Sequence, residues 1–325
     1  MFVTEKGFGI VMLSFDEDFF KGEEIEGFYV KPLMKRCWAA SMELLSEIDK
    51  ICKRHGIVYF ADWGTLLGAV RHGGYIPWDD DMDISMTREN YEKFLKVAPD
   101  ELPDDCKMDE SYSYLEHAMR VWGWKTVSTK TEHLQRKHGY PYVVGIDIFV
   151  IDNIPDNKDD VKSLQEIWKY SWIMANSWND EKIALTEEQK EDFLEVFEEV
   201  IGKKLDRTQD VRKEIIYYLD RLAAMYYDLD TEYGAIAIDF YGNDNNQLIP
   251  REYYTETVEI PFYNMMIPAP KEYEKFLAIR YGDWRTPVRG GADHEYPYFK
   301  DQIEVLREEY RKLGYTLPKQ FDWVD

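Results

Sequence analysis

Four aspartates are crowded into the five positions from Asp79 to Asp83. Carboxylates this close repel one another unless a cation neutralises them. If residues 81–86 form a strand, side-chain alternation places Asp81 and Asp83 on one face and the apolar residues between and after them on the core face. Mg²⁺ binds oxygen ligands, usually one or two carboxylates together with water and substrate phosphates. The spacing therefore predicts a Mg²⁺ site, with Mn²⁺ as an alternative, on Asp81 and Asp83, with Asp79 in the preceding turn as a further ligand.

A glycine-rich, arginine-bearing run precedes the aspartates. Residues 57–61 have the pattern of a strand, followed by a tight turn at Gly64 and Thr65 and a short helix over residues 66–70. A glycine lets a phosphate approach the backbone, and the N–H groups at the start of a helix attract anions. We therefore expect Gly64 and Thr65 to bind a phosphate, and Arg71 to neutralise charge on it, to pair with the aspartates, or to do both. Glycine turns and acidic loops are each common alone, so their combination is what predicts a site.

The surrounding elements must position this run. Apolar residues recur at helical spacing over residues 31–55, and Gly56 is placed to end that helix in a left-handed conformation. Residues 143–150 alternate as a strand, with apolar residues toward the core and Asp147 on the face with the metal. Asp152 follows on the loop and is the alternative acid if Asp147 proves to be structural.

Other segments are expected to flank this centre. Thr87 is expected to cap a helix that Pro99 ends, and residues 119–125 are expected to form a strand. Residues 130–140 are rich in His, Lys and Arg, a composition typical of a solvated loop. The alternative is a contact with phosphate or acceptor through Arg136, Lys137 or His138.

The next stretch, residues 159–229, has helical periodicity throughout. Thr186 and Gln189 within it match a capping box. Beyond it, residues 235–241 and 257–266 return to strand patterns.

Composition limits the classes of partner and compartment. The chain has 325 residues, 45% of them hydrophobic, enough for a substantial core. A formal net charge of -23 argues against nucleic acid and anionic membrane surfaces as partners. Its three cysteines, Cys37, Cys52 and Cys106, are too few and scattered for a disulfide framework or zinc site, which suits a reducing cytoplasm. We expect no signal peptide and no transmembrane segment.

The run from Trp63 to Ile84 resembles the signature of the LicD family, which has a nucleotidyltransferase fold and includes the fukutin-related transferases. Gly64-Thr65 matches the glycine at the strand-to-helix turn, and Asp81-Met82-Asp83 matches the acid-x-acid strand. Asp147 fits the third acid of the pattern. Residues 267–287 resemble the family's C-terminal segment, a proline-entered helix followed by Tyr-Gly-Asp-Trp and a proline.

The resemblance implies Mg²⁺-dependent transfer of phosphocholine from CDP-choline to a hydroxyl of a cell-surface glycan or glycolipid precursor, as in teichoic acid or lipopolysaccharide biosynthesis. CDP-ribitol, CDP-glycerol and phosphoethanolamine donors remain open. Asp81 and Asp83 would hold one metal or two, and Asp147 would be the third ligand or the general base. Gly64, Thr65 and Arg71 would contact the donor diphosphate. The protein would be cytoplasmic, or peripheral at the inner face of the membrane.

A choline group would need an aromatic cage, because a quaternary ammonium is held by cation–π contacts. Trp63, Trp78 and Trp284 are candidates among the 10 tryptophans of the chain. Two other classes are open: a nucleotidyltransferase that moves a nucleotide from a nucleoside triphosphate to a small acceptor, and a non-catalytic relative. The joint presence of the three acids speaks against the second.

We therefore expect a mixed α/β (α+β) fold, with a nucleotidyltransferase-like mixed sheet, flanking helices and a helical insertion. The expected parts are an N-terminal extension (residues 1–30), the catalytic core (31–155), a helical insertion that recognises the acceptor (156–232), and a C-terminal part that completes the catalytic domain (233–325).

Overall fold

The computed structural model describes residues 12–109, 119–180, 182–183, 185–242, 247–290 and 296–323. The α-helices are α1 (Pro32–His55), α2 (Trp63–His72), α3 (Arg88–Glu101), α4 (Thr131–Arg136), α5 (Lys158–Ser177), α6 (Glu187–Ile201), α7 (Val211–Ala223), α8 (Tyr273–Tyr281) and α9 (Lys300–Lys312). The strands are β1 (Glu23–Ile25), β2 (Phe28–Val30), β3 (Phe60–Ala61), β4 (Asp83–Thr87), β5 (Lys107–Met108), β6 (Met119–Gly123), β7 (Val144–Ile154), β8 (Tyr233–Ile236), β9 (Ile249–Pro250), β10 (Thr257–Phe262) and β11 (Met265–Pro270). Short helical turns lie at Glu17–Phe20, Ala224–Tyr226, Ile238–Gly242 and Arg251–Tyr253.

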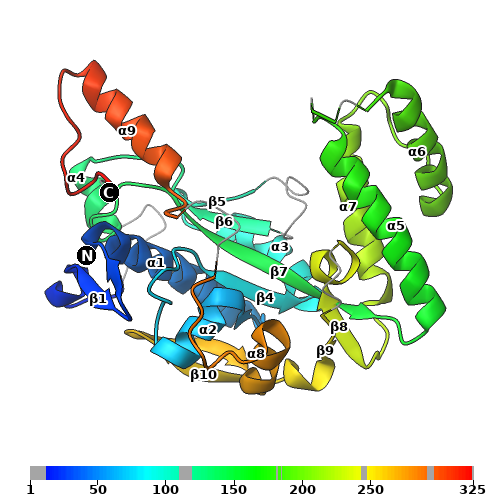
Figure 1. Cartoon of the computed structure of the whole chain (residues 1–325), viewed down its shortest axis with the longest axis horizontal. Coiled ribbons are helices and arrows are strands. Elements are labelled where there is room, and N and C mark those ends of the chain that lie inside the picture. The colour runs from blue at the N-terminus through cyan, green and yellow to red at the C-terminus, as the bar shows by residue number, and fades with distance from the viewer. Residues whose placement is uncertain are drawn as a thin grey trace.

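A mixed sheet in the order β3-β4-β7-β6-β5 forms the centre of the molecule (Figure 1). β4 and β7 pair in parallel, whereas β3, β6 and β8 pair antiparallel with their neighbours. The long β7 pairs with β4 and β6 over its first part and extends beyond them to pair with β8. The mixed α/β fold expected from the sequence is thus confirmed.

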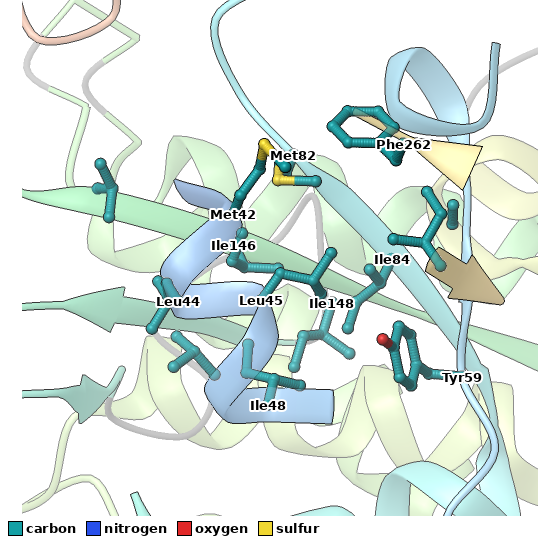
Figure 2. Packing of buried hydrophobic residues seen from close by; sticks show 14 of the residues in the cluster. Met42, Leu44, Leu45, Ile48, Tyr59, Met82, Ile84, Ile146, Ile148 and Phe262 are labelled. Atoms are coloured by element: carbon teal, nitrogen blue, oxygen red, sulfur yellow. The ribbon is translucent and has the colours of Figure 1, made fainter. Parts of the chain in front are cut away.

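Helix α1 packs against one face of the sheet, as the sequence predicts. Pro32 opens it with a φ suited to a helix, and Gly56, at φ 61°, ends it in the left-handed region. The side chains of α1 and those of β4 and β7 point into a common core (Figure 2): Leu44, Leu45, Ile48, Ile84, Ile146 and Ile148. Because side chains alternate along a strand, the residues between these isoleucines face the opposite side of the sheet.

The helices α5, α6 and α7 lie together at one end of the sheet (Figure 1) and form a second hydrophobic core with residues of β7, β8 and the turn at Ile238–Gly242. Within that core, the indole Nε1 of Trp168 donates to the carbonyl oxygen of Leu219 at 3.1 Å. The capping box predicted at Thr186 and Gln189 is confirmed, because each side chain bonds the other's backbone N–H. Among the helices of the described residues, none is both long and apolar enough to cross a membrane.

Several local predictions were wrong. The strand expected over residues 57–61 is confined to β3, since the N–H of Val58 donates to the Asn90 side chain at 2.8 Å instead of to a neighbouring strand. Pro99 does not end α3, because proline removes one hydrogen bond while the N–H of Leu102 still reaches the carbonyl of Ala98 at 2.9 Å.

Two further segments also differ from expectation. The strand expected over residues 235–241 stops with β8, and a π-helical turn, Ile238–Gly242, follows. No helix was expected at Lys300–Lys312, where α9 buries Ile303 and Leu306.

A buried ion pair joins α3 to β7. Arg88 donates to both carboxylate oxygens of Asp152 at 2.7 Å and to Asp220 of α7 at 2.8 Å. Asp152, the alternative to Asp147 as the third acid, is 1% exposed and lies on the core-facing side of β7. Its pairing with Arg88 indicates a structural role.

Replacing Arg88 with leucine is expected to lower the free energy of unfolding by about 3–5 kcal/mol, because Asp152 would remain buried without its partner. Arg54→Leu is the matched control, since Arg54 pairs with Glu101 at the surface, where such a pair contributes about 0–1 kcal/mol. Urea unfolding of both variants measures the difference. Equal losses would contradict the structural role of the Arg88 pair.

Candidate active site

The acidic residues gather on the sheet face opposite α1. Asp83 is the first residue of β4 and is in register with Asp147 on β7, so the two side chains are neighbours. The N–H of Asp147 donates to the carbonyl of Met82 at 3.2 Å and extends this pairing. Asp81 precedes β4, so the expectation that the strand begins at Asp81 was wrong. Its carboxylate nevertheless lies close enough to raise the pKa of Asp83.

Burial and like charge act together on these carboxyl groups. Burial is the main cause that raises the pKa of Asp83 well above its ordinary value, and the charges of Asp81, Asp147 and Asp79 add to it. Burial likewise raises the pKa of Asp79, with Asp81 the next cause. Ionisation of either carboxyl group therefore destabilises the folded protein, unless a cation offsets the repulsion.

The arrangement fits a divalent metal ion. Carboxylate oxygens of Asp79, Asp80 and Asp81 all lie within 4.8 Å of one another. Such hard, anionic donors are those that Mg²⁺ and Mn²⁺ prefer. Asp80 has a structural bond as well, because its Oδ2 accepts from the N–H of Tyr298 at 2.7 Å, so Asp79 and Asp81 are the better candidates of these three. Asp83 is not in this group, and its place in the metal site remains a prediction.

Gly64 and Thr65 lie in the first turn of α2, not in a turn before it. A Cβ at Gly64 would come within 2.2 Å of Oδ2 of Asp79, so the glycine makes room for this carboxylate. The Thr65 hydroxyl oxygen accepts the N–H of Asp83 at 2.8 Å and is buried. The two halves of the motif are thus in direct contact, and each of these residues positions one acid. Phosphate binding by them remains a prediction.

This contact gives a specific expectation for Gly64→Ala. The added methyl group would displace the Asp79 carboxylate, so we expect Mn²⁺ affinity to fall about tenfold, as is typical when a supporting group of a metal site is changed. The fold should persist, since alanine favours a helix. Electron paramagnetic resonance of free Mn²⁺ and circular dichroism measure the two effects. Unchanged Mn²⁺ binding would contradict a role for Asp79 in the site.

A buried pair beneath α2 was missed in the sequence. Asp62 caps α2 by accepting the N–H of Trp63 at 2.7 Å, and it is fully buried. Its Oδ2 accepts from Arg280 of α8 at 2.8 Å and from Ser85 of β4 at 2.6 Å. Figure 1 shows α2 and α8 next to one another. An aspartate directly before a helix is an N-cap signal that could have identified Asp62, whereas no local signal identifies Arg280.

Arg120, also missed, lies beside the third acid. It is opposite Asp147 in the antiparallel pair of β6 and β7, and its guanidinium forms a two-point ion pair with that carboxylate, with Nη2 2.5 Å from Oδ2. Its ring neighbour is Trp122, whose centroid is 4.9 Å from the guanidinium carbon. Side-chain alternation along β6 could have predicted which face of the sheet carries Arg120, but not that Arg120 lies opposite Asp147.

Arg71 is at the far end of α2 and donates to the carbonyl of Trp284 at 3.1 Å. Arg71 is thus bonded to the C-terminal segment, a contact that was not among the two roles expected for it, phosphate binding and pairing with the aspartates.

The three candidate cage tryptophans each contact an arginine instead of one another. The guanidinium carbon of Arg280 lies 4.0 Å from the centroid of the Trp63 ring. That of Arg285 lies 4.1 Å from the Trp284 ring, and that of Arg289 lies 5.4 Å from the Trp78 ring. A choline cage on these rings remains a prediction.

The basic segment is not a solvated loop, because it contains α4 and packs on the core. Lys137 is 2% exposed, its Nζ lies 4.2 Å from the Trp124 ring centroid, and burial lowers its pKa to about 6. Arg136 pairs with Asp105 at 3.1 Å, and His138 lies 2.9 Å from Glu43.

The fold and site define a class: a mixed sheet carrying neighbouring acids on two parallel strands, beside the first turn of a helix. Residues 56–175 match the family model of the LicD/FKTN/FKRP nucleotidyltransferase domain. Over these residues the chain is therefore similar to the LicD family, as its motifs predicted.

Two relatives illustrate the similarity. The chain is 23% identical over 244 residues to the lipopolysaccharide cholinephosphotransferase LicD of Haemophilus influenzae, covering 75% of this chain and 88% of that protein. It is 37% identical over 54 residues to the human ribitol 5-phosphate transferase FKRP, covering 17% of this chain and 11% of that protein. The similarity to the first extends across most of both chains, whereas that to the second is limited to a short segment.

Proposed function

We propose that the protein is a metal-dependent phosphotransferase that moves phosphocholine, or a related phospho-alcohol, from a CDP-activated donor to a hydroxyl of a cell-surface glycan precursor. The observation that carries the proposal is the pairing of Asp83 with Asp147 on parallel strands, beside Asp81, within the segment similar to the LicD family. Similarity to a cholinephosphotransferase and to a ribitol 5-phosphate transferase supports a phosphotransferase. Choline and the cytidine donor are the finer part of the proposal.

The chain's residues divide the work of such a transfer. Asp81 and Asp83, with Asp79, would hold the metal, which when bound would neutralise charge on the phosphate oxygens. Gly64 leaves room for the Asp79 carboxylate at the start of α2, and Thr65 fixes the backbone at Asp83. These contacts set the metal-binding acids before substrate arrives, which is how a phosphotransferase lowers its barrier, by positioning and charge stabilisation.

Asp147 has two open roles, as a metal ligand or as the base for the acceptor hydroxyl. Both of its oxygens accept hydrogen bonds from Arg120. A carboxylate oxygen has a second lone pair, so Asp147 could bind a metal without losing Arg120. This geometry favours the ligand role.

The helices α5, α6 and α7 are proposed to recognise the acceptor. They lie within residues 156–232, the helical insertion expected from the sequence. They lie at one end of the sheet and are anchored to the core through the Arg88 network. The donor phosphate would then bind at the acidic residues of the sheet, and the acceptor would approach from the side of α5, α6 and α7.

Purified protein incubated with CDP-choline, Mg²⁺ and a glycan-acceptor extract tests the function. We expect CMP release and a phosphocholine-sized mass gain on the acceptor, both lost with a chelator and in Asp83→Asn. If CDP-choline stays intact while CDP-ribitol or CDP-glycerol is consumed, the choline assignment fails. Consumption of nucleoside triphosphates alone would favour the nucleotidyltransferase class.

A further inference from the structure

We infer that Arg120 is the residue that binds the phosphate of the donor at this site, a role that the sequence analysis gave to Arg71. The inference rests on the proposed function. It concerns one side chain on β6 that no motif of the chain marks.

The first observation is the position of Arg120 across the sheet. Asp83, Asp147 and Arg120 occupy matched positions on the adjacent strands β4, β7 and β6. Matched residues on adjacent strands point to the same face, and strands are spaced about 4.8 Å apart. A guanidinium therefore follows the acids in a row, with one carboxylate between it and Asp83. A phosphate held on this face at the acids would be within the reach of this guanidinium.

The second observation is how firmly Arg120 is held. Asp147 binds it at two points, and Trp122 lies beneath its guanidinium. The Trp122 indole is itself fixed by its bond to Asp109 at 2.5 Å. A Cβ at Gly145 would come within 2.9 Å of Cδ of Arg120, so this glycine lets the side chain lie flat along β7. A guanidinium with a fixed plane suits two-point binding of a phosphate.

The third observation is accessibility. Both Arg120 and Arg280 are paired with carboxylates, but the Arg120 side chain is 27% exposed, whereas that of Arg280 is 1% exposed. Arg71 donates to the Trp284 carbonyl. Of these three arginines, Arg120 combines exposure with a place on the sheet face that carries Asp83 and Asp147.

Opposite effects on metal and nucleotide binding would separate this role from a merely structural one. Arg120→Gln removes a positive charge beside the metal acids, so Mn²⁺ should bind about threefold to tenfold more tightly. The same change removes charge-assisted hydrogen bonds to phosphate, so CDP should bind about 10- to 100-fold more weakly at saturating Mg²⁺. A residue that only positioned Asp147 would weaken Mn²⁺ binding when removed.

The experiment measures Mn²⁺ and CDP binding by isothermal titration calorimetry in wild type, Arg120→Gln and Arg120→Lys. Lysine keeps the charge but lacks the planar pair of N–H donors of a guanidinium, so Mn²⁺ binding should stay near wild type and CDP binding should be intermediate. Arg54→Gln, which removes one positive charge from a surface pair with Glu101, should leave both affinities unchanged.

Unchanged CDP binding in Arg120→Gln, or a loss of Mn²⁺ binding in that variant, would overturn the assignment and leave the proposed function standing. If the wild type binds neither Mn²⁺ nor CDP, the proposed function itself fails, and this inference with it.

Discussion

Replacing Asp83 with asparagine is expected to abolish transfer and, at the same time, to make the metal-free protein more stable. Loss of a metal ligand removes several kcal/mol of transition-state stabilisation, or about 10³-fold in rate. The stability should rise by about 0.5–2 kcal/mol, because an amide removes one charge from the half-buried acidic cluster. The backbone contact with Thr65 uses the N–H of Asp83 and survives the change.

The pH dependence of stability provides the check. The folded pKa of Asp83 is raised above its ordinary value of 3.8, so between that value and the folded pKa the native state binds more protons than the unfolded state. The free energy of unfolding of the metal-free protein therefore falls as the pH rises through this window. This fall should be smaller in Asp83→Asn.

Thermal unfolding in a chelator, repeated across the pH range and then with Mg²⁺, measures both effects. Mg²⁺ should stabilise the wild type, by binding the native state, and should have little effect on the variant. If the variant were as stable as wild type at every pH and responded equally to Mg²⁺, Asp83 would not belong to a metal-binding acidic cluster.

Replacing Arg280 with methionine is expected to destabilise the fold by about 3–5 kcal/mol, because it leaves buried charge without a partner. Arg280 pairs with Asp62 at 2.8 Å and with Asp239 at 3.3 Å, and its guanidinium lies 4.0 Å from the Trp63 ring. Its loss would leave Asp62, which caps α2, as an uncompensated charge beneath the site.

Arg285→Met in the same segment is the matched control. Arg285 pairs with Glu274 at 3.1 Å and is 60% exposed, so its loss should cost about 1 kcal/mol or less. Urea unfolding compares the two variants. A second variant, Arg280→Lys, should recover part of the stability because it keeps the charge. Equal stability of the methionine variants would show that the buried pair contributes nothing specific.

Local periodicity was sufficient to predict much of the framework. The helix α1, the capping box at Thr186 and the alternation of β7 all depend on spacings of a few residues, and all three are confirmed. Such features are set by backbone hydrogen bonds between near neighbours and by the apolar face that each element must bury. Where distant contacts compete, as at Val58, local reasoning failed.

The spacing of the aspartates predicted a metal site on Asp81 and Asp83 with Asp79, and the structure brings carboxylate oxygens of Asp79, Asp80 and Asp81 within 4.8 Å of one another. Crowded carboxylates are a local property of the chain, so sequence alone could indicate their chemistry. That Gly64 makes room for Asp79, and that Thr65 holds Asp83, could not be read from spacing, because these contacts arise when α2 folds back on the start of β4.

The partners of the acids were decided by tertiary structure. Arg120 and Asp147 are separated by 27 positions in the sequence, and Asp62 and Arg280 by 218, and no local pattern connects either pair. Register between strands depends on the whole sheet, and a slip of one residue would turn Asp83 or Arg120 to the other face. The spacing of the chain indicated which acids could bind a metal. The cations beside these acids follow from the tertiary structure, because charges far apart in the chain become neighbours when the sheet and helices pack together.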